Sequence, residues 1–106
     1  MVCRGIRAEV RSLTYRALAV RDLRSIAAWT RERWGEDQAR TYSDRLRADI
    51  KGLRDSALRF PEHIARSGRY RKMRSGSHVV FYLVDDAHVE IVRIVHQSRD
   101  FESQLT

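Results

Sequence analysis

One stretch of the chain, HVVFYLV from His78 to Val84, is apolar at almost every position. A strand with one face in solvent alternates apolar and polar side chains, because successive side chains point to opposite faces of the sheet. This run has no polar face, so it predicts a strand in the centre of a sheet with both faces covered. The remainder of the chain must therefore supply material for two sides of that strand.

Turn-forming residues flank this run on both sides, RSGS (74–77) before it and DDAH (85–88) after it. The sequence YRKMR (70–74) alternates before the first turn, and VEIVRIVH (89–96) follows the second. Three strands joined by tight turns predict an antiparallel meander. A further short strand is predicted from about Ser12 to Leu18, where apolar and polar residues alternate.

Two amphipathic helices are predicted between the first strand and the meander. Each has apolar residues at steps of three and four. These are Val20, Leu23, Ile26, Ala27, Thr30 and Trp34 in the first, and Ala39, Tyr42, Leu46, Ile50, Leu53 and Ala57 in the second. Gly35 ends the first helix, and Pro61 in FPEH stops the second by disfavouring helical backbone at Phe60. Only one or two residues around Gly35 join the two helices, which predicts an antiparallel helical hairpin. Packed on the sheet, this hairpin gives an α+β fold.

The length of the chain limits how much of the sheet it can cover. A chain of 106 residues fits one domain, which we expect to span residues 12–106 after a flexible N-terminal extension of residues 1–11. A domain of this size has little material to cover both faces of the central strand. We therefore expect an exposed apolar patch, and such patches usually bind a partner.

The chain is strongly basic, with a formal net charge of +7. That excess suits an acidic protein, a nucleic acid or an acidic membrane surface, and basicity alone does not choose among them. Cys3 is the single cysteine, so no internal disulfide is expected and a reducing cytoplasm is the simplest compartment. No apolar run approaches the length that spans a bilayer, so no membrane association is expected.

Several motifs, in this order and spacing, resemble the ParE branch of the RelE/ParE toxin superfamily over residues 13–105. They are Asp22-Leu23, ERWG (32–35), FP (60–61), GSHVVFY (76–82) and VEIVRIVHQSRD (89–100). The family often begins its first helix with Ser-Pro or Thr-Pro. Here Arg16 and Ala17 stand at those positions, so the usual capping hydroxyl is missing.

The resemblance implies the toxin of a bacterial type II toxin–antitoxin pair. Members of the ParE branch poison DNA gyrase by protein–protein binding and are neutralised by a ParD-like antitoxin, here expected to carry an acidic flexible tail. Nucleic acid would then be met only through the antitoxin or the target. The alternative is a ribosome-dependent mRNA endoribonuclease of the RelE type, and a third possibility is a degenerate toxin kept for complex formation.

A metal-free ribonuclease needs a base, an acid and cations that converge on one phosphate. His96 stands where one RNA-cleaving branch carries a catalytic histidine, and Lys72 and Arg74 would be the phosphate binders. Gln97 replaces a tyrosine of that branch, and His78 stands where it keeps an arginine. The set is incomplete, so we favour a non-enzymatic toxin and expect no catalytic residue. The alternative interpretation of His96 is a strand-end histidine bonded to the C-terminal tail.

The resemblance implicates the C-terminal region in toxicity, so the expected target contacts are Arg93, His96, Arg99 and Asp100. Arg93 stands alone in an apolar strand, which also predicts pairing with a nearby carboxylate. Phe101 and Leu105, four residues apart, predict a short terminal helix pinned to the core.

The antitoxin is expected to bind exposed apolar and basic positions, namely Trp29, Leu58, Arg69 and Arg71. The basic run around 66–74 has a second interpretation as a solvated edge strand, since charges keep edge strands from pairing. Trp34 continues the helical stripe and is expected in the core. Four histidines and one cysteine show no metal-ligand spacing, and no phosphate-binding glycine loop is present, so neither metal nor cofactor is expected.

Overall fold

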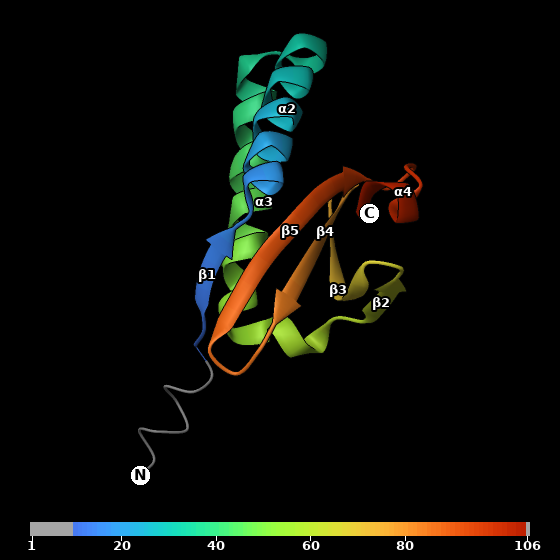
Figure 1. The fold of residues 1–106 in the computed structure, drawn as a ribbon. Coiled ribbons are helices and arrows are strands. Elements are labelled where there is room, and N and C mark those ends of the chain that lie inside the picture. Colours follow the sequence, from blue (N-terminus) through green and yellow to red (C-terminus); the bar gives the residue numbers. More distant parts are fainter. Residues whose placement is uncertain (1–9, 106) are drawn as a thin grey trace.

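The computed structural model describes residues 10–105, and Figure 1 shows the order of the regular elements. They are β1 (Ser12–Tyr15), α2 (Ala17–Trp34), α3 (Glu36–Ser56), the 3-10 helix η1 (Ala57–Arg59), β2 (Glu62–Ala65), β3 (Gly68–Ser75), β4 (His78–Val84), β5 (His88–His96) and α4 (Phe101–Leu105). The strands form one sheet in the order β1-β5-β4-β3-β2. Neighbours are antiparallel except β1 and β5, which run parallel. The predicted α+β class, with its strand, helical hairpin and antiparallel strands, is confirmed.

The helical hairpin α2–α3 packs on one face of the sheet and makes the larger hydrophobic core. Leu46, Ile50 and Leu53 of α3 are fully buried against Val80 and Tyr82 of β4. The Tyr82 hydroxyl is satisfied within this core, because it donates a hydrogen bond to the carbonyl of Ala57 at 2.5 Å. The apolar stripe of α3 therefore faces the sheet as its spacing predicts.

The opposite face of the sheet holds a second, smaller core. Its buried members are Tyr70, Val79, Phe81, Val92, Val95 and Leu105. The short helix α4 covers part of this face, with the ring centroid of Phe101 4.9 Å from that of Phe81. The continuous apolar run of β4 thus has both faces buried, as predicted, but the chain itself supplies more of the second cover than expected. The terminal helix predicted from Phe101 and Leu105 is present.

Three details of the predicted elements were wrong. Four strands follow the hairpin, not three, because β2 pairs with β3 from Glu62↔Arg71 to Ala65↔Gly68. As a result β3 is an inner strand, and the interpretation of residues 70–74 as an edge strand fails. The first strand ends at Tyr15, and α2 begins with Arg16 as an N-cap that makes no side-chain cap bond.

Trp34 is the third correction, since its side chain is 61% exposed where the stripe predicted a core position. Figure 1 shows the reason: the end of the hairpin where α2 meets α3 projects beyond the sheet, so no strand of the described residues 10–105 lies under it. Gly35 joins the two helices there with a φ of 94°, a conformation that glycine adopts without a Cβ penalty.

The N-terminal extension predicted for residues 1–11 lies outside the described residues, apart from Val10 and Arg11. Arg11 is buried. Its backbone N–H donates to the carbonyl of Arg54 at 2.8 Å, and its Nε donates to the carbonyl of Asp85 at 2.7 Å. These bonds attach Arg11 to α3 and to the β4–β5 turn.

Candidate functional site

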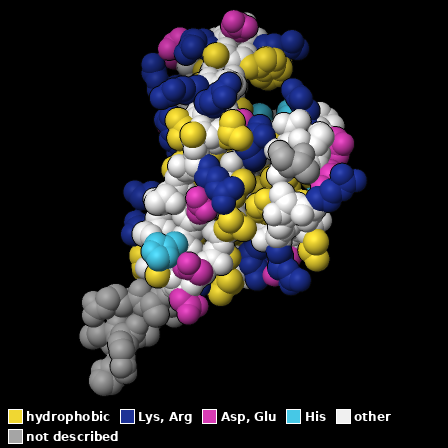
Figure 2. Space-filling model, in the orientation of Figure 1, with side chains coloured by type: hydrophobic (Ala, Val, Ile, Leu, Met, Phe, Trp, Pro, Cys, Tyr) yellow, Lys and Arg dark blue, Asp and Glu magenta, His cyan; other side chains and the backbone are white. Residues whose placement is uncertain are grey.

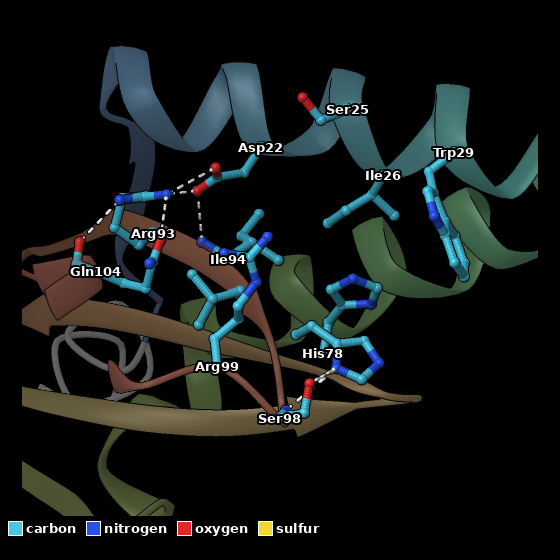
Figure 3. Close-up of a pocket in the computed structure, with 12 residues that line it drawn as sticks. Asp22, Ser25, Ile26, Trp29, His78, Arg93, Ile94, Ser98, Arg99 and Gln104 are labelled. Carbon is cyan, nitrogen blue, oxygen red and sulfur yellow. Dashed lines mark hydrogen bonds and ion pairs between the residues drawn. The ribbon is translucent and has the colours of Figure 1, made fainter. Parts of the chain in front are cut away.

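A cleft of about 480 Å³ lies between α2 and the C-terminal ends of β5 and the chain. Figure 3 shows α2 above it, with the strand and tail residues below. The lining side chains are Asp22, Ser25, Ile26, Trp29, His78, Arg93, Ile94, Val95, His96, Ser98, Arg99 and Gln104. Three of the four predicted target contacts, Arg93, His96 and Arg99, are therefore brought together in one place.

Arg93 forms the predicted ion pair, and its partner is Asp22 of α2. Arg93 Nε lies 2.8 Å from Asp22 Oδ2, and Nη2 lies 3.1 Å from Oδ1, so the contact is bidentate. Asp22 Oδ2 also accepts the backbone N–H of Ile94 at 2.9 Å. This N–H is free for Asp22 because β1 pairs with β5 only as far as Ile91, which leaves the end of β5 as a sheet edge. A side chain thus replaces a missing strand neighbour.

Arg93 also fixes the C-terminal helix. Its Nη1 donates to the carbonyl of Gln104 at 2.8 Å, and its Nη2 lies 3.4 Å from Gln104 Oε1. The pair Asp22–Arg93 therefore links α2, the edge of β5 and α4. Most of the hydrogen-bonding capacity of this guanidinium is used inside the protein.

His78 and His96 face each other across β4 and β5, with ring centroids 5.5 Å apart. Tyr42 of α3 places its hydroxyl 2.6 Å from His78 Nδ1, and Ser98 places its hydroxyl 2.8 Å from His96 Nδ1. The bond from His96 to the tail was predicted and is confirmed. Burial, followed by the nearby His96, lowers the pKa of His78 to about 4, against a smaller raising effect of Asp22. His78 is thus a neutral ring near pH 7.

Tyr42 is a part of this cluster that the sequence did not indicate, since its place on the α3 stripe predicted only a core residue. Its hydroxyl also accepts the backbone N–H of Ser77 at 3.0 Å, across the β3–β4 turn. Gly76 lies in that turn with a φ of +60°, and a Cβ built there would come 2.7 Å from the Tyr42 hydroxyl. The turn and the phenol therefore fit together only because residue 76 has no side chain.

We expect Gly76→Ala to lower the free energy of unfolding by about 2 kcal/mol, because it adds a strained backbone conformation to a contact with Tyr42. Urea unfolding measures the change. Gly52→Ala is the matched control: Gly52 lies inside α3 with open space around a new Cβ, so it should hold or raise stability. Equal losses in both variants would contradict this account of the turn.

The residues of the nuclease alternative are not assembled around the cleft. Lys72 points to the α4 side of the sheet, where its Nζ lies 5.9 Å from the centroid of Phe101. Arg74 donates from Nε to the carbonyl of Gly76 at 3.0 Å. Neither side chain lines the cleft that contains His96.

The four predicted antitoxin contacts fall in two separate places. Trp29 is half-exposed in the cleft, with the guanidinium of Arg33 4.9 Å from its ring centroid. Leu58, 57% exposed, lies in η1 next to the sheet. Near it, Arg71 donates to the carbonyl of Phe60 at 2.6 Å. Arg69 and Arg71 also approach Glu62, at 3.4 and 3.8 Å.

Asp100, the fourth predicted target contact, does not line the cleft. Its Oδ1 accepts the backbone N–H of Glu102 at 3.2 Å, so it stabilises the start of α4. Among residues 10–105 no three His, Cys, Asp or Glu side chains come close enough to hold a metal ion. Within the same range no helix has the length and apolarity needed to cross a membrane.

A helical hairpin on one face of a mixed five-stranded sheet is an α+β fold that other small proteins share. Two solved structures share this fold. One, described as the chromosomal ParDE TA system from P. aeruginosa, superposes with a TM-score of 0.70 at 18% identity, over 83% of this chain and 97% of that chain. The other, a chain of the archaeal RelE-RelB complex from Pyrococcus horikoshii OT3, gives a TM-score of 0.61 at 14% identity, over 86% of this chain and 99% of that chain.

Sequence comparison narrows the class to one family. The sequence profile described as ParE toxin of type II toxin-antitoxin system, parDE, matches residues 13–101. Toxin ParE1 of Caulobacter vibrioides is 40% identical over 85 residues, which cover 79% of this chain and 86% of that protein. Toxin ParE1 of Mycobacterium tuberculosis is 36% identical over 85 residues, which cover 72% and 79%. The chain belongs to the ParE family and is the toxin component of a type II toxin–antitoxin system.

Proposed function

We propose that this toxin poisons DNA gyrase by protein–protein binding, leaves the DNA chemistry to gyrase, and is neutralised by a ParD-like antitoxin. Gyrase lies in the cytoplasm, so this is also the proposed location of the toxin. The observation that carries the proposal is the composition of the cleft. It gathers binding groups, including Trp29, Arg99 and two histidines, whereas Lys72 and Arg74 lie elsewhere.

The proposed target contacts are Arg93, His96, Arg99 and Asp100, and we propose different roles for them. Arg99 is exposed and makes no side-chain ion pair with any residue in 10–105, so its guanidinium is available to a partner. Arg93 and Asp100 are engaged in bonds that hold β5 and α4 in place. We therefore assign direct contact to Arg99 and His96, and positioning to the other two.

The proposed antitoxin carries an acidic flexible tail that folds onto the toxin as it binds. Support comes from the two structural neighbours, whose descriptions are of toxin–antitoxin assemblies. Exposed apolar side chains at Trp29 and Leu58 offer anchor points, and Figure 2 shows apolar side chains lying among many Lys and Arg side chains. At Arg69 and Arg71 an acidic tail must compete with Glu62, which lowers the gain expected there.

The gyrase proposal is tested with purified toxin in supercoiling and DNA-cleavage assays. We expect toxin-dependent accumulation of cleaved DNA held by gyrase, and Arg99→Glu should reduce potency at least tenfold because it reverses the charge of a contact residue. Arg66→Glu, a charge reversal of an exposed arginine outside the cleft, should retain potency. Absence of any effect on gyrase at saturating toxin would overturn the proposal.

The second candidate function is a ribosome-dependent mRNA endoribonuclease. One observation favours it, namely the close approach of His96 and His78 in the cleft, with the Tyr42 hydroxyl bonded to His78 behind it. Primer extension on translated messages discriminates between the candidates. Cleavage within codons, abolished by His96→Ala, would establish the nuclease, whereas intact messages during growth arrest would exclude it. A toxin that causes neither effect and no growth arrest would be degenerate.

A further inference from the structure

We propose that the cleft contains a receptor for a single carboxylate, formed by the Nε2–H groups of His78 and His96 together with the guanidinium of Arg99. The occupant is a glutamate or aspartate side chain of the antitoxin's acidic tail, so this inference rests on the proposed antitoxin partner. The groups that define the receptor are two neutral imidazole donors whose tautomers are set by their hydrogen bonds.

The tautomer of His78 follows from the bonds of Tyr42. The Tyr42 hydroxyl accepts the N–H of Ser77, so its own proton is free for an acceptor. His78 Nδ1 lies 2.6 Å away, whereas the carbonyl of Ser75 and the hydroxyl of Ser77 each lie 3.4 Å away, beyond the usual range for an O–H···O bond. The phenol therefore donates to Nδ1, and the ring carries its proton on Nε2.

The tautomer of His96 follows from the backbone of the tail. The N–H of Ser98 donates to His96 Nδ1 at 3.1 Å, which requires a lone pair on that nitrogen. The neutral ring therefore carries its proton on Nε2 as well. In each ring Nε2 lies on the side away from the bonded Nδ1, and both residues line the cleft.

His78 is only 7% exposed, and no residue in the described range 10–105 accepts a hydrogen bond from its Nε2. No buried side-chain nitrogen or oxygen in the described range lacks a partner, so this Nε2 reaches the solvent of the cleft. A ligand carboxylate would therefore take the place of water on a directed N–H donor. Because the pKa of His78 is lowered to about 4, this ring remains a neutral donor near pH 7. The receptor thus offers directed N–H groups without the charge of an imidazolium.

The charges of the lining residues favour a ligand group that carries one negative charge. Asp22 neutralises Arg93, while Arg99 has no carboxylate partner within residues 10–105. Ile26 and Trp29 form an apolar wall beside these donors, as seen on α2 in Figure 3. A carboxylate on an aliphatic stem fits this pairing of apolar wall and anion donors. A nucleic acid strand, with a charge at each nucleotide, would require more cations than the cleft provides.

Imidazole tautomers are read directly by long-range ¹H–¹⁵N spectra of the labelled full-length toxin at pH 7.5. We expect both His78 and His96 in the Nε2–H form. Tyr42→Phe should remove the preference at His78 and leave that of His96 unchanged, because Ser98 fixes the latter. An Nδ1–H tautomer at either ring in the unaltered toxin would overturn the receptor.

Binding is tested with the peptide acetyl-Leu-Glu-Leu-Leu-Glu-Leu-amide and its isosteric Gln counterpart, followed by tryptophan fluorescence and by the His78 and His96 signals. We expect at least tenfold tighter binding of the Glu peptide, with both Nε2 resonances shifting. Arg99→Gln should abolish that preference. Arg24→Gln, which removes an exposed arginine of α2 outside the cleft, should retain it.

Equal binding of the two peptides would overturn the receptor, as would displacement of the Glu peptide by a short single-stranded oligonucleotide at comparable concentration. Gyrase cleavage is measured on the same protein samples. Loss of gyrase poisoning with retained Glu preference counts against the proposed target alone, whereas loss of Glu preference with retained poisoning counts against the receptor alone.

Discussion

Asp22→Ala should lower the free energy of unfolding by about 3 kcal/mol, the lower end of the range for a buried pair, because it removes one partner of a partly buried, bidentate ion pair. The side chains of Arg93 and Asp22 are only 17% and 16% exposed. Removing the carboxylate leaves the guanidinium without its counter-charge and the N–H of Ile94 without its acceptor. Urea unfolding of the purified toxin measures the loss.

Three further variants separate charge from hydrogen bonding in this prediction. Asp22→Asn keeps an oxygen for Ile94 but loses the charge, so its loss should be intermediate. The double variant Asp22→Leu/Arg93→Met should recover much of the stability, because no buried charge is left unpaired. Asp44→Ala, an exposed acid of α3, is the control and should change stability by less than about 0.5 kcal/mol. A loss in Asp22→Ala no larger than in Asp44→Ala would contradict the role of the pair.

The parts of the fold that could be predicted are those encoded by local patterns. The apolar run of β4 indicated a doubly covered central strand, and β4 does lie between β5 and β3. The stripes of α2 and α3 indicated the hairpin, because helical periodicity is a property of neighbouring residues. Trp34 continues the same stripe but is exposed, since the length of sheet beneath the hairpin is not a local property.

β2 could not be predicted because four residues with no strong pattern become a strand only through pairing with β3. This pairing is a short hairpin that closes at Ala65↔Gly68, and residues 62–65 carry no alternation that would mark them as its first strand. The pairing of β1 with β5 is long-range, from Ser12↔His88 to Tyr15↔Ile91, and local sequence patterns carry little information on it. The resemblance to ParE toxins gave the class of fold but not the identity of these strands.

The pairing of His78 with His96 in the candidate site depends on the register between β4 and β5, which residue types alone do not reveal. Near the β4–β5 turn, Val84 pairs with Val89, and continuing that register would place His78 opposite Val95. A bulge at Phe81/Tyr82 shifts the pairing by one residue, so His78 faces His96 instead. Since a one-residue slip moves a side chain to the other face, the histidine pair exists only because of this bulge. An ion pair between Arg93 and a carboxylate could be predicted from the sequence. The identity of that carboxylate could not, because Asp22 lies 71 residues away along the chain.

The neutral state of His78 leads to the second large effect, a loss of stability on acidification. Its pKa in the folded protein is about 4, below its ordinary value of 6.5, so the unfolded chain takes up a proton before the folded protein does. Above pH 6.5 the ring is neutral in both the folded and the unfolded state, and the free energy of unfolding is at its full value. As the pH falls from 6.5 to 4, only the unfolded chain takes up the proton, so the free energy of unfolding decreases. The full difference corresponds to about 3 kcal/mol.

The experiment compares urea unfolding between pH 7.5 and 4.5 for the unaltered toxin and two variants. His78→Gln removes the titrating group, so its stability should fall less steeply with acidification, even though the variant starts from a lower value at pH 7.5. His88→Gln removes an exposed histidine of the β4–β5 turn and should keep the original profile. Backbone hydrogen bonds from Ala87 and His88 are the main cause of the lowered pKa of Asp85, with a smaller part from the His88 ring, so the control changes that carboxylate only slightly. The other carboxylates largely cancel in the differences. A parallel profile for His78→Gln would show that the ring at position 78 is not held neutral by burial, and the donor role assigned to it in the cleft would fail with it.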